Sequence, residues 1–413
     1  RTRILRETSK TWINVPDRRA LVTLQDGRFL WPSERDGFRH LYLFERDGKL
    51  VRQLTDGAWV VDEIEAVDER DGLVYFSGNR EHPTERHLYV VPLAGGAARR
   101  LTPEAGTHAV TLDHACQRFV DVWSALDQPP RVALRSTKDG AVLHPMPVPA
   151  DPRVARFHLE PPELVTLRSR DGAELHGAVY RPPARFGPGP HPTIVHVYGG
   201  PHAQMVKNDW SLTAALQMQY LRQLGYLIFR LDNRGSARRG MAFEAPIRHR
   251  LGHIEVDDQV DGVRWLVARG LTDAARVGVT GWSYGGYMTL RCLELAPDVF
   301  KVGVSGAPVT DQAGYDTAYT ERYMGTPQSN AAGYAASSVL AAVNTMRGHL
   351  LLVHGLLDEN VHFRHTARLI NALNRARKPY DLLIFPDERH MPRHQSDRVY
   401  LNERVIGYFQ QHL

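Results

Sequence analysis

Three residues in the second half of the chain have the types and the order needed for nucleophilic catalysis. They are Ser283, Asp358 and His390. A serine hydroxyl is a weak nucleophile unless an imidazole takes its proton. The imidazole in turn needs a carboxylate that fixes its tautomer and stabilises its charged form. The three residues together predict acyl transfer through a covalent serine intermediate.

Ser283 lies in the segment Gly281-Trp282-Ser283-Tyr284-Gly285-Gly286, which fits the pattern G-x-S-x-G. A β-rich run, residues 276–280, leads into this segment, and a helix-compatible run, residues 287–296, leads out of it. Strand, sharp turn and helix form the context in which this common pattern is a nucleophile elbow. The glycines agree with this interpretation, because a Cβ beside the strained serine would clash.

The acid and the histidine each follow an apolar run, residues 350–353 for Asp358 and residues 381–385 for His390. In α/β-hydrolases the chain order is serine, acid, histidine. Position after the correct strand therefore favours these two residues. Neighbours of the same types compete with them, namely His354, His362, His365, His394, Glu359 and Asp387. Asp387 is a poor candidate for the acid because it is only three residues from His390 on the same loop.

The reaction also needs hydrogen-bond donors for the negative charge that develops on the substrate oxygen. One predicted donor is the backbone N–H of Tyr284, directly after the nucleophile. The second usually comes from the loop after the third strand, here residues 197–202. That loop offers either a backbone N–H or the phenol of Tyr198, and the spacing does not decide between them.

The sequence pattern from residue 163 onwards predicts the sheet that positions the serine, the aspartate and the histidine. An antiparallel hairpin around Asp171-Gly172 opens it. Short apolar runs then alternate with helical stretches, which is typical of parallel strands buried on both faces. These runs are residues 193–198, 226–231, 276–280, 302–305, 350–353 and 381–385. Eight strands with helical crossovers, and an elbow after the fifth, predict a doubly wound α/β sheet of the α/β-hydrolase type.

The first third of the chain shows a repeat of short strands and turns. Its units begin near residues 29, 74 and 119, a step of 45 residues, and Asp-Gly pairs supply hairpin turns. A four-stranded repeat of this length predicts β-propeller blades, with a β-sandwich as the rival interpretation. Three blades do not close a ring, since propellers typically have about four to eight. We therefore expect further blades upstream of Arg1 or on another chain.

Length and composition predict a two-domain globular protein of 413 residues. We expect blades over residues 1–150, a linker over residues 151–162 at the end of a proline-rich stretch, and the hydrolase over residues 163–413. The net charge of +5 is mild, and no nucleic-acid-binding signature is present. No apolar run approaches the length of a membrane span. Cys116 and Cys292 are the only cysteines and are predicted to lie in different domains, which disfavours a disulfide framework.

Several motifs together resemble the dipeptidyl peptidase IV-like serine peptidases of the prolyl oligopeptidase family. They are residues 281–287, 315–325 and 358–363, supported by residues 250–252 and 255–259. The resemblance extends more weakly into the blades, through residues 37–40 and 57–59. It implies an exopeptidase that removes N-terminal dipeptides with proline or alanine second. It implies no cofactor or metal, and a homodimer. It leaves the location open, because the family has periplasmic, cell-surface and cytosolic members, and favours a periplasmic or extracellular location over a cytoplasmic one.

The resemblance also implies roles for individual residues. Ser283, Asp358 and His390 would be the catalytic triad, with Tyr198 and the Tyr284 N–H forming the oxyanion hole. Asn360 would bond the carbonyl of the first substrate residue. The pocket for the proline ring would be lined by Trp282, Val309, Tyr315, Tyr319 and Val361. Tyr315 and Tyr319 are four residues apart. Without the resemblance, this spacing predicts two core residues that pack on one face of a helix.

Two departures from the family pattern bear on specificity. Family members grip the substrate amine with two adjacent glutamates, and this chain has no Glu-Glu pair. Gln312 stands where some members have a tryptophan beside the pocket.

The same triad would also suit an acyl-aminoacyl peptidase, a tripeptidyl peptidase or an esterase. A third possibility from another class is a propeller binding module with an inert hydrolase domain, which the complete elbow, acid and histidine argue against.

Overall fold

The computed structural model describes residues 2–15 and 20–413, which form two compact units. The first unit holds the described residues up to Pro161 together with the segments Lys207–Ala214 and Ala237–Glu244. The second unit holds Pro162–Val206, Ala215–Ser236 and Ala245–Leu413. Two short segments from the hydrolase half of the sequence thus make most of their contacts with the blades.

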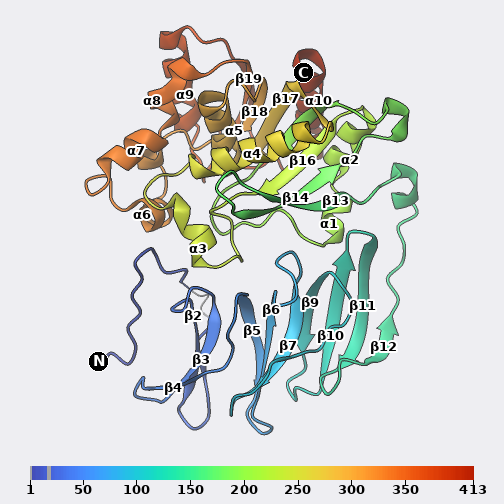
Figure 1. The fold of residues 1–413 in the computed structure, drawn as a ribbon, viewed down its shortest axis with the longest axis vertical. Coiled ribbons are helices and arrows are strands. Elements are labelled where there is room, and N and C mark those ends of the chain that lie inside the picture. Colours follow the sequence, from blue (N-terminus) through green and yellow to red (C-terminus); the bar gives the residue numbers. More distant parts are fainter. Residues whose placement is uncertain (1, 16–19) are drawn as a thin grey trace. The chain divides into compact units, whose positions relative to one another are not determined.

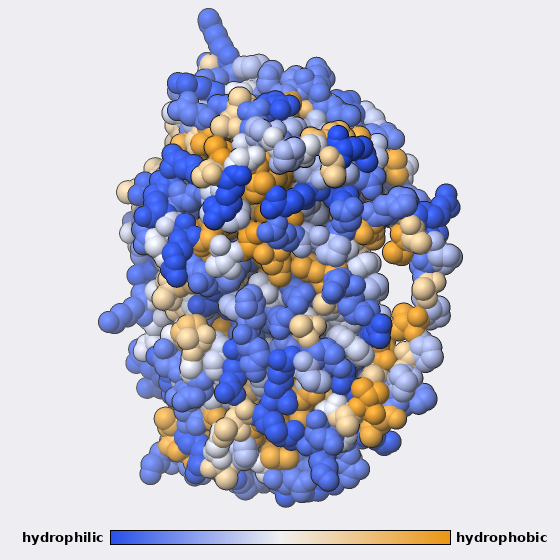
Figure 2. Space-filling view, turned by 45° about the vertical axis from the view of Figure 1, so that its right-hand side comes forward, coloured by the Kyte–Doolittle hydropathy of each residue, from blue (hydrophilic) through white to orange (hydrophobic). Residues whose placement is uncertain are grey.

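None of the described helices combines the length and the apolar composition that a membrane crossing requires. Figure 2 shows hydrophilic residues over most of the face drawn, with apolar residues in smaller groups between them. Scattered exposed apolar side chains are normal on a folded protein.

Three antiparallel four-stranded sheets build the first unit (Figure 1). In each sheet the strands lie in chain order, so each strand pairs with the next one along the chain. The strands are β1 (Val22–Thr23), β2 (Phe29–Ser33), β3 (His40–Phe44), β4 (Leu50–Gln53), β5 (Val61–Asp68), β6 (Leu73–Gly78), β7 (His87–Pro92), β8 (Arg99–Arg100), β9 (Thr107–Leu112), β10 (Arg118–Ala125), β11 (Gln128–Ser136) and β12 (Val142–Met146). The predicted blades are therefore confirmed.

A buried histidine and threonine explain why the first two units of the repeat share a pattern. His40 begins β3, and its Nδ1 lies 3.0 Å from the Thr55 hydroxyl. His87 begins β7 and makes the equivalent contact with Thr102 at 3.2 Å. In both blades the threonine hydroxyl also accepts a backbone N–H from the residue after the histidine. The contact ties the third strand of each blade to the residues that follow the fourth.

The predicted proline-rich stretch begins within a strand. Pro145 lies on β12, which is the edge strand of its sheet, where a missing N–H donor is tolerated. After β12 the described backbone contains only a short 3-10 helix, η2 (Val154–Phe157), before the second unit begins at Pro162.

One eight-stranded sheet forms the centre of the second unit, in the order β13-β14-β16-β15-β17-β18-β19-β20. The first two strands are antiparallel to their neighbours, and the strands from β16 onwards run parallel. The strands are β13 (Glu163–Arg168), β14 (Glu174–Tyr180), β15 (His191–His196), β16 (Leu227–Asp232), β17 (Thr272–Trp282), β18 (Val302–Gly306), β19 (His349–Gly355) and β20 (Asp381–Phe385). The predicted doubly wound sheet is confirmed, and β17, which ends just before Ser283, is its fifth strand in the chain.

Helices follow most of these strands, and those that belong to the second unit cover the sheet (Figure 1). The α-helices are α1 (Trp210–Thr213), α2 (Leu216–Gln223), α3 (Met241–Glu244), α4 (Ile254–Ala268), α5 (Tyr284–Leu295), α6 (Thr317–Met324), α7 (Ala331–Ser337), α8 (Val339–Ala342), α9 (Arg364–Ala376) and α10 (Gln395–His412). Short 3-10 helices are η3 (Ala184–Phe186), η4 (Ala245–Ile247), η5 (Gln312–Gly314) and η6 (Val343–Thr345). Helix α5 is buried along almost its whole length.

The placement of Tyr315 and Tyr319 on one helix face is wrong. Helix α6 begins at Thr317, because the Asp316 side chain accepts the N–H of Tyr319 and caps the helix. Tyr315 therefore precedes the helix in extended backbone. The two rings still meet, with centroids 5.6 Å apart in an edge-to-face arrangement.

Candidate active site

Ser283 lies in the strained turn that the sequence predicts. Its φ of 61° and ψ of −117° fall outside the common regions for a residue with a side chain, between the end of β17 and the start of α5. Its N–H donates to the Gly306 carbonyl at 2.8 Å. Such backbone costs of order 1–3 kcal/mol and persists only where the surroundings enforce it.

The glycines around Ser283 are required by close backbone packing. A Cβ on Gly281 would lie 2.3 Å from the Val197 carbonyl oxygen, and one on Gly286 would lie 2.3 Å from the Gly306 oxygen. No side chain tolerates such contacts. The pattern that identified the elbow in the sequence is thus a steric requirement of the neighbouring strands.

The structure brings Asp358 and His390 together. His390 Nδ1 is 2.8 Å from Asp358 Oδ2, and Asp358 Oδ1 accepts the N–H groups of Asn360 and Val361 at 2.9 and 2.8 Å. Burial alone would raise the pKa of the Asp358 carboxyl, but hydrogen bonds from His354 and His390 outweigh it and hold that pKa well below its usual range. The carboxylate therefore stays ionised and can orient the imidazole.

The Ser283 hydroxyl has no hydrogen bond to His390 or to any other residue in the described ranges. The two loops are nevertheless adjacent, because the Trp282 indole N–H donates to the His390 carbonyl at 2.6 Å. The His390 side chain is 19% exposed, so its second ring nitrogen is accessible. In unliganded hydrolases the nucleophile–base contact is often long and tightens when substrate binds.

The loop that carries His390 is held by a residue that the sequence analysis missed. Glu388 is buried and accepts the backbone N–H groups of Arg393 and His394, each at 2.9 Å. These bonds lower the pKa of Glu388 to about 2. Glu388, His394 and Asp397 lie close enough together to hold a cation, but the loop already uses the Glu388 oxygens, so this group indicates no metal centre.

Three of the four competing histidines have structural partners, and the fourth, His362, is exposed. His354 contacts the Thr366 hydroxyl and the Val361 carbonyl, each at 2.7 Å, and so holds the loop that contains Asp358. His365 contacts Thr310, and His394 contacts Glu388. Among the competitors for the acid, Asp387 is exposed and Glu359 pairs with Arg389.

Tyr198 and Tyr284 lie beside each other, with ring centroids 6.1 Å apart. Burial raises the pKa of Tyr198, so its hydroxyl remains a proton donor. Tyr284 is the first residue of α5, and its N–H therefore has no acceptor within the helix. The Tyr284 hydroxyl donates to the buried carboxylate of Glu255 at 2.8 Å, a partner that the sequence analysis did not predict.

Of the residues predicted to bind substrate, Tyr315, Tyr319 and Asn360 are brought together. The Tyr315 hydroxyl donates to Asn360 Oδ1 at 2.7 Å. Val309 and Val361 are fully buried, whereas Trp282 is half-buried. The Tyr319 ring also contacts Tyr323, with centroids 5.1 Å apart. The paired rings of Tyr315 and Tyr319 thus lie beside the amide of Asn360.

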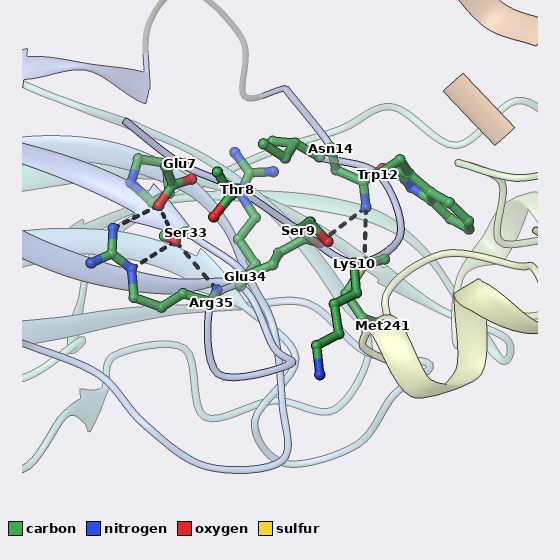
Figure 3. Close-up of a pocket in the computed structure, with 13 residues that line it drawn as sticks. Glu7, Thr8, Ser9, Lys10, Trp12, Asn14, Ser33, Glu34, Arg35 and Met241 are labelled. Carbon is green, nitrogen blue, oxygen red and sulfur yellow. Dashed lines mark hydrogen bonds and ion pairs between the residues drawn. The ribbon is translucent and has the colours of Figure 1, made fainter. Parts of the chain in front are cut away.

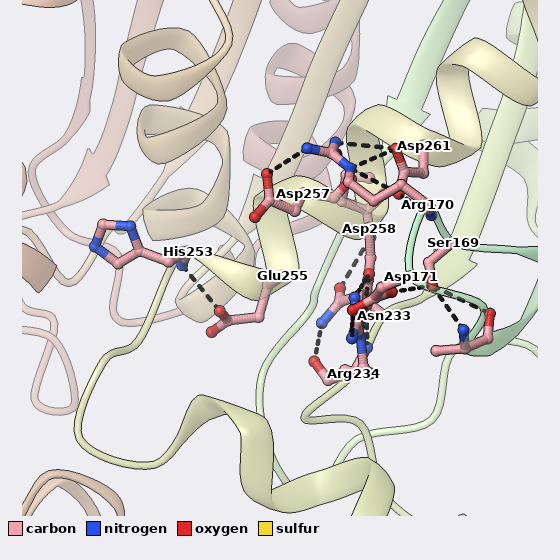
Figure 4. A network of polar contacts seen from close by, with 12 residues as sticks. Ser169, Arg170, Asp171, Asn233, Arg234, His253, Glu255, Asp257, Asp258 and Asp261 are labelled. Carbon is pink, nitrogen blue, oxygen red and sulfur yellow. Dashed lines mark hydrogen bonds and ion pairs between the residues drawn. The ribbon is translucent and has the colours of Figure 1, made fainter.

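A polar network supports the start of α4 and the loop before it (Figure 4). Arg234 pairs with the buried Asp258 at 2.6 Å and with the half-exposed Asp171 at 2.6 Å. The neighbouring Asn233 donates to the Gly199 carbonyl at 3.0 Å, in the loop that presents Tyr198. The sequence gives no signal for these contacts, because each partner comes from a different part of the chain.

The first unit contains a separate polar pocket of about 270 Å³ (Figure 3). It lies between residues 7–14 and the end of β2. Asn14 donates to both Glu34 and Glu244 there, at 3.0 and 2.9 Å. Burial raises the pKa of Glu244 to about 8. The pocket contains none of the predicted site residues.

Comparisons with known proteins agree over nearly the whole chain. The profile of the prolyl oligopeptidase family matches residues 210–413, and that of the dipeptidyl peptidase IV N-terminal region matches residues 1–130. Human dipeptidyl peptidase 8 is 36% identical over 99% of this chain and 50% of its own length. A probable dipeptidyl peptidase 4 of Aspergillus fumigatus is 33% identical over 90% of this chain and 50% of its own length.

The structural comparison agrees with the sequence matches. The crystal structure of Porphyromonas gingivalis dipeptidyl peptidase 4 superposes with a TM-score of 0.93 and 31% identity, over 99% of this chain and 58% of that one. The chain spans about half the length of the curated relatives it matches. It belongs to the prolyl oligopeptidase family of serine peptidases, among its dipeptidyl peptidase IV-like members.

Proposed function

We propose that this chain carries the catalytic machinery of a serine exopeptidase that releases N-terminal dipeptides with proline or alanine second. The observation that carries the proposal is the Asp358–His390 pair, 2.8 Å apart, beside a serine in a strained elbow. The names of the relatives, which are dipeptidyl peptidases, support the reaction class.

In this mechanism His390 removes the proton of the Ser283 hydroxyl while the oxygen attacks the carbonyl carbon of the second substrate residue. The protonated imidazole then gives that proton to the leaving amine, and an acyl-enzyme remains on Ser283. His390 then takes a proton from a water molecule, which attacks the acyl-enzyme carbonyl and frees the dipeptide, and the proton returns to Ser283. Asp358 stays ionised throughout and stabilises the charged imidazole.

The oxyanion donors in this proposal are the Tyr284 N–H and the Tyr198 hydroxyl. Both groups lack a hydrogen-bond acceptor among the described residues, so both are available to a developing negative charge. The neighbouring Asn233 contact with the Gly199 carbonyl holds the loop that carries Tyr198.

The substrate's second residue would lie against Tyr315, Tyr319, Trp282, Val309 and Val361. A flat ring suits an aromatic wall with few polar groups. Because Asn360 Oδ1 already accepts the Tyr315 hydroxyl, the Asn360 amide N–H₂ remains as a donor. We infer that it bonds the carbonyl of the first substrate residue.

The test is hydrolysis of a Gly-Pro chromogenic amide by the intact gene product that contains this chain. We expect turnover that Ser283→Ala abolishes, and labelling of the wild type alone by a fluorophosphonate probe. Equal turnover by both proteins would contradict the mechanism. A second substrate with an acetylated amine separates the reaction classes: a dipeptidyl enzyme rejects it, whereas an acyl-aminoacyl peptidase or an esterase accepts it.

We further propose that the working enzyme is a homodimer with more blades than the three sheets described. Three four-stranded sheets are too few for a closed propeller. The chain has no adjacent glutamates for the substrate amine, so that function would fall to other blades. Light scattering on the intact gene product measures the oligomeric state, and a monomer would contradict the dimer.

A further inference from the structure

Glu255 is a fully buried carboxylate at the start of helix α4. Its Oε1 accepts the Gly252 N–H at 2.8 Å, and its Oε2 accepts the His253 N–H at 3.0 Å (Figure 4). The third donor is the Tyr284 hydroxyl, which lies 2.8 Å from Oε1. Three donors around two oxygens favour the ionised form of the group, because an ionised carboxylate only accepts hydrogen bonds.

Among the described residues, no arginine, lysine or histidine side chain forms an ion pair with Glu255. Burial raises the pKa of this carboxyl, and the hydrogen bonds from Gly252, Tyr284 and His253 oppose that rise. The first turn of a helix also favours a negative charge. Buried charges are normally paired, so a carboxylate without a counter-ion, in contact with the residue that follows the predicted nucleophile, is a candidate for a functional role.

The Tyr284 side chain connects Glu255 to the loop that presents Tyr198. Tyr284 is buried, and its ring centroid lies 6.1 Å from that of Tyr198. A Cβ on Gly200, in the same loop, would lie 2.7 Å from Tyr284 Cγ and 3.0 Å from Tyr198 Cε1. Both rings therefore pack against the Gly200 backbone. Because close-packed groups transmit displacements, a shift of the Tyr284 ring would move this loop.

We propose that Glu255 is a positioning residue of the proposed oxyanion hole. Its carboxylate holds the Tyr284 phenol, and the Tyr284 ring holds the Tyr198 hydroxyl where the substrate oxygen becomes negatively charged. The loop has a second support in Asn233, whose amide donates to the Gly199 carbonyl at 3.0 Å. The inference rests on the proposed peptidase function. In this role Glu255 touches neither the substrate nor the reacting atoms.

The Tyr284 N–H, which is the other proposed oxyanion donor, has supports that do not involve Glu255. The Ser283 N–H donates to the Gly306 carbonyl at 2.8 Å, and close backbone packing holds the glycines around Ser283. The backbone of the elbow is thus fixed independently of the Tyr284 phenol. We therefore expect the contact between Glu255 and Tyr284 to act on catalysis through Tyr198.

The test is a double-mutant cycle on the intact gene product with a Gly-Pro chromogenic amide. Tyr284→Phe removes only the hydroxyl that Glu255 holds. Its kcat should fall by about tenfold to 10²-fold, the scale of a small misplacement of a catalytic group, with little change in KM. In the Tyr198→Phe background the same change should lower kcat by less than about threefold, because the donor that it positions is already absent. Equal losses in both backgrounds would overturn the inference, as would a wild-type kcat in Tyr284→Phe.

Tyr287→Phe is the matched control. Tyr287 is buried on the same helix, and its hydroxyl contacts the carbonyls of Leu251 and Ser337, each at 2.9 Å. These carbonyls lie outside the Tyr198 loop, so kcat per active site should stay at the wild-type value even where the melting temperature falls. If Tyr287→Phe lowered kcat as much as Tyr284→Phe, the loss would reflect a general loosening of α5, and the inference would be wrong.

Glu255→Gln tests the carboxylate itself. The amide keeps one acceptor, but its N–H₂ group faces the backbone N–H of Gly252 or His253, so both the Tyr284 contact and the stability of the fold are weakened. In the folded variant kcat should fall at least as far as in Tyr284→Phe, and a wild-type kcat would contradict the proposal. Where Glu255→Gln does not fold, the cycle with Tyr284→Phe decides.

A second readout separates the inference from the function on which it rests. Labelling of Ser283 by a fluorophosphonate places negative charge on a phosphonyl oxygen, so it uses the same donors without requiring peptide specificity. The second-order labelling rate should follow the same cycle. Absence of Gly-Pro turnover by the wild type contradicts the peptidase proposal alone, and the labelling rates then decide the role of Glu255. Absence of labelling contradicts the serine mechanism and the inference together.

Discussion

Each of the two units contains an aspartate–histidine pair of nearly the same geometry. In the blades, His108 Nδ1 lies 2.9 Å from Asp121, and in the hydrolase, His390 Nδ1 lies 2.8 Å from Asp358. The pairs differ at the second ring nitrogen. His108 Nε2 is engaged with the Glu104 carbonyl at 3.0 Å and its side chain is fully buried. The second nitrogen of His390 has no partner in the described ranges, and its ring reaches solvent.

The carboxylates differ in the same way. Asp121 also pairs with the buried Arg135 at 2.8 Å, so its charge serves to join strands β10 and β11. Asp358 Oδ1 instead accepts two N–H groups of its own loop, and its Oδ2 lies 2.8 Å from His390 and 3.2 Å from His354. Its partners are thus backbone groups and histidines, not an arginine. An aspartate–histidine pair is thus suited to catalysis only where the far nitrogen of the imidazole is open to a substrate.

The largest effect expected from this comparison is on catalysis. Asp358→Asn leaves the imidazole in place but removes the charge that fixes its tautomer, so kcat for a Gly-Pro amide should fall by about 10⁴. The melting temperature should change far less than the rate. Steady-state kinetics with active-site titration measures this, and a fall of less than tenfold would show that Asp358 does not orient His390.

The matched change in the blade should affect stability instead. Asp121→Asn removes one of the two carboxylates that pair with the buried Arg135, the other being Glu104 at 2.8 Å, and so costs about 1–3 kcal/mol of unfolding free energy. Denaturant unfolding followed by tryptophan fluorescence checks this, since Trp123 stacks beside His108. The rate per folded molecule should stay at the wild-type value. If Asp121→Asn reduced kcat as strongly as Asp358→Asn, the distinction between the two pairs would fail.

The oxyanion side of the site gives the next largest effect. Tyr198→Phe removes one proposed donor without changing the ring, and kcat should fall by about 10²–10³ with little change in KM. Tyr323→Phe is a suitable control because Tyr323 is buried in the same tyrosine cluster but has no proposed oxyanion role. A wild-type kcat in Tyr198→Phe would assign the second donor to the backbone of the same loop.

The parts of the site that the sequence predicted are those set by local chemistry. The elbow was recognisable because the glycines beside Ser283 are demanded by close backbone packing within a few residues. Asp358 and His390 were recognisable because each follows a short apolar strand. The blades were recognisable because units of short strands and turns recur at a step of 45 residues.

The parts that were missed depend on contacts between distant segments. Glu255 meets Tyr284 and Asn233 meets Gly199 across gaps of 29 and 34 residues, and nothing in the local pattern marks either acceptor. The start of α6 was misplaced for a different reason. The periodic spacing of Tyr315 and Tyr319 suggested one helix, but the Asp316 cap between them determines where the helix begins.

A third aspartate extends the comparison to a pair that solvent reaches. Asp171 pairs with Arg234 at 2.6 Å, but its side chain is 53% exposed, unlike those of Asp121 and Asp358. Solvent screening weakens such pairs, so Asp171→Asn should cost less than about 1 kcal/mol of unfolding free energy at pH 7. Hydrogen bonds from Arg234 and Ser169 lower the pKa of Asp171 to about 2.

Because the pKa of Asp171 is lowered in the folded state, its contribution is complete above the unfolded value of about 3.9 and disappears as the pH falls toward 2. The difference in unfolding free energy between wild type and Asp171→Asn should therefore be constant from pH 7 to about pH 5 and shrink below pH 4. Denaturant unfolding across this range measures it. A cost near 3 kcal/mol at pH 7 would show that solvent exposure does not govern the strength of these ion pairs. It would also show that the loss of the Asp171 charge disturbs Arg234, which pairs with the buried Asp258 as well.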